Sequence, residues 1–180
     1  MVGARPIAVF LPALFVLMSG CVKGTWQEFI SSEGRFSVMM PEKPKETYAE
    51  KETDLARMQV HTFSNEEFLV LFTVAYVDFP AHPAGRPDVR WEAERIFSVA
   101  HEGIMHALEV STLWRYENVD IGGHPGQTFN SERDKNFRRI KSKLVWVEPR
   151  LYQVVAAAYE FPGMSQEENL DRFLNSFKLR

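Results

Sequence analysis

The stretch that most constrains the fold runs from residue 140 to residue 160 and is predicted to be a β-hairpin. Its two arms are joined across residues 148–150, Glu-Pro-Arg. The second arm, residues 151–159, is apolar on both faces apart from Gln153. Because successive side chains of a strand point to opposite sides, such an arm must be covered on both sides. The sequence therefore predicts a central strand, and the rest of the chain must supply its neighbours and its covering layers.

Two helices are predicted among the remaining strands. An apolar stripe at helical spacing over residues 89–108 indicates a long mid-chain helix, with Asp88 as its N-cap. Apolar residues at i, i+3, i+4 and i+7 from Leu170 indicate a C-terminal helix, and Ser165 with Glu168 have the spacing of a capping box. Several strands, a helix, more strands and a final helix predict an α+β fold, in which helices pack on an antiparallel sheet.

The other strands and turns are less regular. A turn is predicted at residues 32–35, in which Gly34 supplies a positive φ. A second turn at residues 65–67 precedes residues 68–79, which are nearly all apolar or β-branched and predict another central strand. The polar residues 47–54 predict an edge strand or a loop. With 180 residues, 45% of them hydrophobic, the chain has enough apolar material for one sizeable core.

The first 20 residues predict a secretion signal rather than a membrane span. Arg5 supplies a positive charge, and residues 7–18 form an uncharged apolar run. That run is shorter than the roughly 20 residues that a membrane-spanning helix needs. A short basic start, an apolar run and small residues before a cleavage site are typical of a secretory signal peptide.

The signal ends in Leu17-Met18-Ser19-Gly20-Cys21, which resembles the lipobox of bacterial lipoproteins, although Met18 stands where that motif usually has Leu. The resemblance implies that Cys21 is lipidated and begins the mature chain, with residues 21–25 as a short tether to a domain over residues 26–180. Two or more acyl chains anchor a protein stably. The chain is thus expected in the bacterial cell envelope, on a membrane and outside the cytoplasm. The alternative is a general signal peptide with an incidental cysteine.

Several short motifs of turn residues and core aromatics are spread along the mature chain. They are Glu28-Phe29, Glu33-Gly34-Arg35-Phe36-Ser37-Val38, Pro41-x-x-Pro44-Lys45, Gly123-His124-Pro125-Gly126, Arg150-Leu151-Tyr152-Gln153 and Arg172-Phe173-Leu174-x-Ser176-Phe177. Together they resemble the PsbP-like α/β sandwich, shared by photosystem extrinsic subunits and a Ran-GTPase-binding nuclear import factor. Members of this fold mostly bind other macromolecules by differing surfaces. The resemblance therefore implies a non-catalytic binding or assembly module without a cofactor.

Candidate catalytic and metal-binding residues do not combine into a site. His101 and His106 flank Glu102 but lie five residues apart, about 140° around a helix, so they cannot reach one metal. Ser131 follows His124 in the sequence but stands in no nucleophile motif. No metal site is predicted. A hydrolase or a small-molecule carrier, with a site assembled from scattered residues, is the alternative to a binding module.

Positive charge is concentrated in one segment. Residues 133–143 contain six basic residues and one acidic residue, a net charge of +5, whereas the whole chain carries −3. Of these, Arg139, Lys141 and Lys143 share one face of a predicted strand. They form either a solvated face or a docking surface for anionic headgroups or an acidic envelope protein. The loop at residues 122–126 either binds an anion through its backbone amides, or its glycines only allow the backbone to turn. No nucleic-acid partner is expected.

Overall fold

The fold is described from a computed structural model. It covers residues 25–52, 57–67, 69–80, 91–109, 115–131, 138–163 and 165–180. The predicted signal peptide, the lipobox and Cys21 lie outside these residues. No helix among them is long and apolar enough to cross a membrane.

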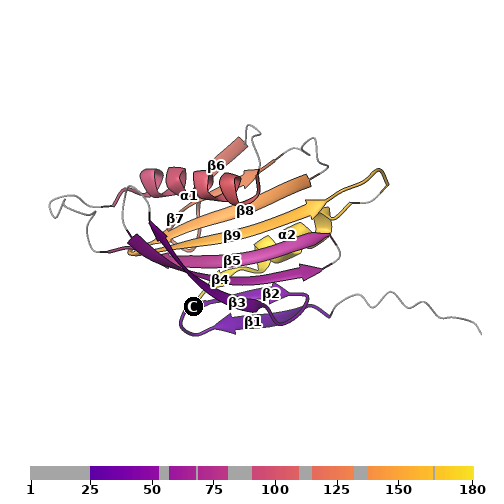
Figure 1. The fold of residues 1–180 in the computed structure, drawn as a ribbon, viewed down its shortest axis with the longest axis horizontal. Helices are drawn as coiled ribbons and strands as arrows, with labels where there is room; N and C mark the ends of the chain where they lie inside the picture. The colour runs from indigo at the N-terminus through magenta and orange to yellow at the C-terminus, as the bar shows by residue number, and fades with distance from the viewer. Residues whose placement is uncertain are drawn as a thin grey trace, which may run out of the picture.

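A seven-stranded antiparallel sheet forms the middle of the structure (Figure 1). Its strands, in spatial order, are β3 (Lys45–Glu52), β4 (Arg57–Glu67), β5 (Val70–Asp78), β9 (Arg150–Tyr159), β8 (Arg138–Val147), β7 (Pro125–Asn130) and β6 (Arg115–Asp120). Strand β9 has three strands on each side, and its hairpin with β8 pairs Val147 with Arg150. The predicted central strand is confirmed. Strand β3 is the polar edge strand that the sequence suggested.

Different layers cover the two faces of this sheet. Helix α1 (Ala93–Ala107) lies on one face. Helix α2 (Glu167–Ser176) lies on the other, together with a small three-stranded sheet of β1 (Gln27–Ser31), β2 (Phe36–Met40) and β10 (Lys178–Leu179) (Figure 1). Two helices packed on antiparallel sheets confirm the predicted α+β fold.

Each face of β9 contributes to a separate apolar core. Tyr152, Val154 and Ala156 point into the α2-side core, which also contains Phe36 and Phe173. The intervening residues Leu151 and Val155 point into the α1-side core with Ile96, Phe97, Ile104 and Trp146. The alternation of β9 side chains thus places half of an apolar strand in each core, as its sequence required.

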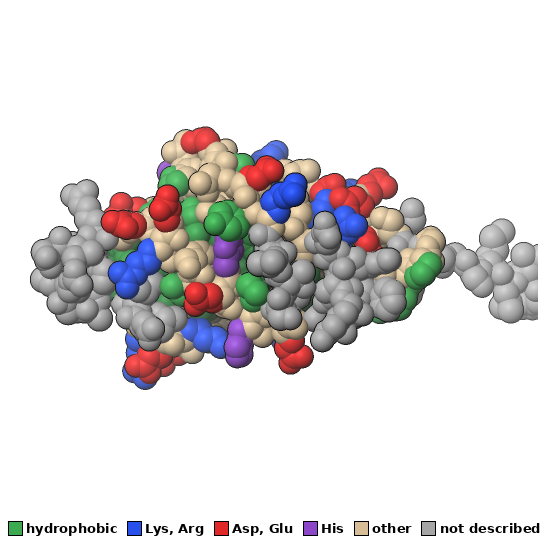
Figure 2. Space-filling view, turned by 90° about the horizontal axis from the view of Figure 1, so that it is seen from above, with side chains coloured by type: hydrophobic (Ala, Val, Ile, Leu, Met, Phe, Trp, Pro, Cys, Tyr) green, Lys and Arg blue, Asp and Glu red, His purple; other side chains and the backbone are tan. Residues whose placement is uncertain are grey.

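The outer surface over α1 has a mixed character. Figure 2 views the molecule from this side, and its described side chains are interspersed acidic, basic and apolar groups. Helix α1 therefore presents a polar outer face and buries its apolar stripe, the usual arrangement for a helix that covers a sheet.

Two turns differ from their predicted form. In the turn at residues 32–35, the positive φ belongs to Arg35, at 54°. Gly34 is needed for space instead, because a Cβ there would lie 2.6 Å from Cε1 of Phe36. Strand β4 continues through residues 65–67, where a turn was predicted, and the positive φ of 67° falls on Leu69. The polar residues of β4 are tolerated because they pair with β5.

The helix starts also differ from the prediction. Helix α1 begins at Ala93 with Glu92 at its N-cap, and the predicted cap Asp88 lies outside the described residues. Helix α2 has no capping box. The Ser165 hydroxyl accepts a hydrogen bond from the amide of Glu167 (3.3 Å), and the Glu160 carboxylate accepts one from the amide of Gln166 (3.2 Å). An acidic side chain from outside the helix thus takes part of the capping role.

Candidate functional site

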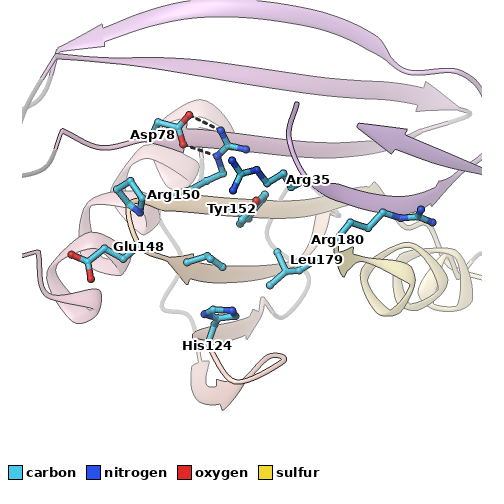
Figure 3. Close-up of a pocket in the computed structure, with 10 residues that line it drawn as sticks. Arg35, Asp78, His124, Glu148, Arg150, Tyr152, Leu179 and Arg180 are labelled. Atoms are coloured by element: carbon cyan, nitrogen blue, oxygen red, sulfur yellow. Dashed lines mark hydrogen bonds and ion pairs between the residues drawn. The ribbon is translucent and has the colours of Figure 1, made fainter. Parts of the chain in front are cut away.

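A pocket of about 420 Å³ opens at the end of the large sheet where β5 and β8 finish and β9 begins (Figure 3). Separate segments bring their residues to it: the β1–β2 turn, the β6–β7 turn, the β8–β9 turn and β10. Its lining includes one histidine, His124, and the charged residues Arg35, Asp78, Glu148, Arg150 and Arg180. Three arginines in the lining of one opening make this pocket the candidate site.

Arg150 is a fixed wall of the pocket. It is the cross-strand partner of Asp78, and its Nε and Nη2 each donate to that carboxylate at 2.6 Å. Its Nη1 donates to the carbonyl of Glu33 (2.8 Å), and its guanidinium lies 4.2 Å from the centre of the Tyr76 ring. Hydrogen bonding to Asp78 raises the pKa of Arg150 despite its burial. Arg150 is therefore neutralised and held within the fold.

Arg180 and Arg35 differ in how they are paired. The Arg180 guanidinium donates to Glu28 at 2.9 Å in an exposed ion pair, and its amide donates to the Arg35 carbonyl at 2.8 Å. The pKa of Glu28 is lowered by hydrogen bonds from Ser37 and Arg180. Among the described residues, no carboxylate lies within ion-pair distance of the Arg35 guanidinium. Arg35 thus brings an uncompensated positive charge to the pocket.

The hydrogen bonds of the loop at residues 122–126 stabilise the turn between β6 and β7. Ile121 and His124 exchange backbone hydrogen bonds of 2.9 and 3.3 Å across it. Gly122 and Gly123 both have positive φ, and the Gly123 amide donates to the Asp120 carboxylate at 2.9 Å. Because the Gly123 amide already donates to Asp120, it is not available to bind an anion, and the predicted anion site has one donor fewer. The loop's contribution to the pocket is the half-buried ring of His124.

The three basic residues predicted to form a docking surface lie beneath α2. Arg139 donates to Glu160 and to Glu167, each at 3.0 Å. Lys141 contacts Glu167 and lies 2.6 Å from Asp171, and only 7% of it is exposed. Acidic residues of this chain therefore neutralise the positive charges of Arg139 and Lys141. An anionic partner could reach this face only if α2 moved.

The two lysines of this face have opposite environments. Burial is the largest single influence on Lys141 and lowers its pKa, but hydrogen bonds to Asp171 and Glu167 outweigh it, so the pKa is raised. Lys143 has no such carboxylate, and its Nζ donates to the carbonyl of Leu174 at 2.9 Å. Burial therefore lowers the pKa of Lys143. Arg133, Lys135 and the side chain of Arg138 lie outside the described residues.

The other candidate residues remain apart. His101 is half-buried against Phe129, with ring centres 4.5 Å apart, whereas His106 is exposed. Ser131 is buried, and its hydroxyl accepts a hydrogen bond from the amide of Ile140 at 2.9 Å. His124 lies beyond the opposite end of β7 from Ser131, about 20 Å away at the rise of a strand. No cluster of potential metal ligands occurs among the described residues.

The sequence did not predict the pocket as a site. Arg35 and Arg150 were noticed only in motifs of turns and core residues, and His124 was weighed only with Ser131 and in the loop at residues 122–126. Arg180 stood in none of them. Their meeting depends on how three turns and β10 come together in space, for which a single sequence carries no signal.

Comparisons with known proteins support the fold. No protein-family model matches the sequence, and no curated protein matches it. Among solved structures, the chain is similar to cyanobacterial PsbP (CyanoP) from Synechocystis sp. PCC 6803, determined in solution. The TM-score is 0.56 and the sequence identity is 12%, and the match covers 89% of this chain and 96% of that chain. The chain therefore has a PsbP-like fold.

Proposed function

We propose that this protein is a lipid-anchored module of the bacterial cell envelope that binds an acidic segment of another envelope protein, without catalysis. The observation that carries the binding role is Arg35, whose guanidinium lines the pocket without an acidic partner among the described residues. A guanidinium offers a planar fork of donors that matches a carboxylate, so a carboxylate is the group that this site suits.

The surroundings of Arg35 support the same ligand. Arg180 lies in the same lining and its pair with Glu28 is exposed, so that its guanidinium can exchange one carboxylate for another at little cost. Arg150 and Asp78 neutralise each other and keep the wall rigid. Counting side-chain charges alone, three arginines against Asp78 and Glu148 leave a net +1 with His124 neutral. An acidic peptide would meet an attractive site.

The anchoring part of the proposal rests on the lipobox resemblance at Cys21. Substitution Cys21→Ser should abolish labelling by radioactive palmitate and leave a larger, unprocessed precursor. The same chain with a conservative change outside Leu17–Cys21, Val9→Ile, should still be labelled and cleaved. Normal maturation of the Cys21→Ser variant would mean that an ordinary signal peptidase acts on the chain and that lipid does not anchor it.

The binding role is tested by crosslinking the full-length protein in intact cells and identifying the captured proteins. Substitution Arg35→Gln removes the free charge and should lose the captured partner. Arg115→Gln removes an exposed arginine at the end of β6 remote from the β6–β7 turn, so it should retain the partner. Capture should weaken in high salt, since charge contacts are screened there. Identical captured sets for both variants would refute binding at this pocket.

A second candidate function is a carrier for a small anionic molecule. It is favoured by the pocket volume of about 420 Å³, which lies in the range of roughly 300–1,000 Å³ typical of small-molecule sites. Thermal unfolding in the presence of citrate, succinate or inorganic phosphate distinguishes the carrier from the binding module. An increase in melting temperature that Arg35→Gln abolishes would favour the carrier, and its absence alongside peptide capture would favour the binding module.

A further inference from the structure

A small apolar group is exposed at the end of the sheet opposite the pocket. It consists of Leu69, Tyr159 and Phe161, with exposed fractions of 39%, 43% and 43%. Leu69 and Tyr159 are neighbours, because the Tyr159 amide donates to the Leu69 carbonyl at 2.9 Å. Phe161 follows two residues after Tyr159. We call these three residues the end patch.

The chain enters the fold at this same end. The ring of Trp26 packs on Phe72 with ring centres 5.2 Å apart, and Phe72 is paired with Ala156. Ala156 precedes Tyr159 by three residues, about 10 Å along a strand. Figure 1 shows the start of β1, the end of β9 and the connection between β4 and β5 at one end of the long axis.

The tether is short in comparison with these distances. Cys21 precedes Thr25, the first described residue, by four positions. At no more than about 3.5 Å per residue, that segment reaches ~14 Å. A lipid attached at Cys21 therefore holds this end of the domain close to the membrane surface.

The charges near the end patch bear on the kind of lipid contact that it makes. Glu66 is exposed beside the turn that carries Leu69, and the guanidinium of the exposed Arg172 lies 4.7 Å from the centre of the Trp26 ring. The basic residues Arg139 and Lys141 are paired with acidic residues under α2 and do not add positive charge to the surface. Exposed charges of both signs therefore lie at this end, so headgroup charge does not select the lipid. Tyrosine, phenylalanine and leucine instead suit the interface between headgroups and acyl chains.

We propose that the end patch rests in the interface between the headgroups and acyl chains of the membrane, and so orients the domain with its pocket away from the bilayer. The inference rests on the lipid anchoring at Cys21 proposed above. The end patch would be a second, weaker membrane contact, which fixes the orientation of a domain that the lipid alone only tethers. The contact is apolar and differs in chemistry from the pocket.

The test places a fluorescent reporter beside the patch without altering it. The chain contains a single cysteine, Cys21, which acylation blocks, so an introduced cysteine can be labelled selectively. One protein carries Glu66→Cys next to the patch, and the control carries Ile30→Cys, which is 48% exposed and lies near the pocket end. Both are anchored in phosphatidylcholine vesicles that contain a nitroxide-labelled lipid, and quenching of the reporter is measured.

We expect strong quenching of the reporter at position 66 and little at position 30. Adding Leu69→Ser and Phe161→Ser to the first protein should reduce its quenching to the level of the control. Equal quenching at both positions, or quenching that the serine variant retains, would overturn the proposal. Stronger quenching in phosphatidylglycerol than in phosphatidylcholine vesicles would also overturn it, because it would show that headgroup charge makes the contact.

A second arm separates this inference from the anchoring itself. The mature chain with Cys21→Ser and an N-terminal histidine tag is held on nickel-chelating lipids, and the same quenching is measured. Differential quenching at position 66 in this arm supports the end patch even if mass spectrometry finds Cys21 unacylated. Loss of the difference here refutes the patch and leaves the lipid anchor to be judged from the mass of Cys21.

Discussion

The two faces of the large sheet are covered by helices of different chemistry. On one face, α1 presents Ile96, Phe97 and Ile104 to apolar residues of the sheet. On the other, α2 buries Leu170 and Phe173 but also directs acidic side chains at the basic residues of β8. The α2 side therefore combines an apolar contact, which has no direction, with ion pairs that fix where along the sheet the helix lies.

This difference explains how a strand with a basic face can lie in a covered part of a sheet. Lys141 is nearly buried, which would be costly for an isolated ammonium group. Glu167 and Asp171 are four residues apart and so share one face of α2, from which both reach it. A basic stripe on a strand is therefore compatible with burial when the covering helix is acidic.

The largest effect is expected from the apolar part of the α2 side. Phe173 is fully buried, so Phe173→Ala should lower the free energy of unfolding by about 3–5 kcal/mol, as measured in urea melts. Asn175→Ala, an exposed position of the same helix, should change it by less than about 0.5 kcal/mol. Phe97→Ala is the matched truncation on the α1 side. A loss at Phe173 far below that at Phe97 would show that α1, and not α2, holds the fold together.

A smaller effect separates the ion pairs from the apolar contact. The double substitution Glu167→Gln and Asp171→Asn leaves Lys141 without either carboxylate and should cost about 2 kcal/mol. This value is below the 3–5 kcal/mol for a fully buried pair because both carboxylates are partly exposed. Replacing the cation, Lys141→Met, should cost less than about 1 kcal/mol, since Glu167 keeps its pair with Arg139 and Asp171 then faces water. Equal losses would mean that the pair itself, and not the unpaired charge, decides stability.

The smallest effect concerns pH and belongs to the α1 side. Burial lowers the pKa of His101, and its Nε2 is buried without a hydrogen-bond partner among the described residues. Because the folded state holds the lower pKa, the unfolded state binds more protons as the pH falls through about 6.5. Stability should therefore decrease on acidification in that window. His101→Gln should flatten this part of the stability curve in urea melts at pH 7.5 and 5.5, and an unchanged slope would assign the dependence to another group.

Local patterns predicted the elements that are defined by burial. The apolar faces of residues 151–159 identified β9 as central, and the spacing from Leu170 identified α2. Alternation also placed Arg139, Lys141 and Lys143 on one face correctly. It could not show what lies over that face, because a basic face turned to water and one turned to an acidic helix have the same alternation.

Predictions that depended on single turn positions were less successful. Gly34 was expected to take the positive φ, but the close approach of Phe36 requires a residue without a Cβ there, and the left-handed conformation falls on Arg35. The capping box at Ser165 does not form because Gln166 is at the N-cap of α2, and the Glu160 carboxylate accepts from the Gln166 amide instead. In the first case a side chain two residues further along decides the local geometry, and in the second a side chain from before the helix takes part.

The turn that carries Arg35 is fastened at several points, which has a consequence for binding entropy. The Glu33 carbonyl accepts from Arg150, the Gly34 carbonyl accepts from the buried Tyr152 hydroxyl at 2.8 Å, and the Gly34 amide donates to Ser31 at 3.0 Å. The backbone beneath Arg35 is therefore preorganised before any ligand arrives. A carboxylate that binds there has to immobilise only the side chain of Arg35, and the cost of ordering the loop has already been met by folding.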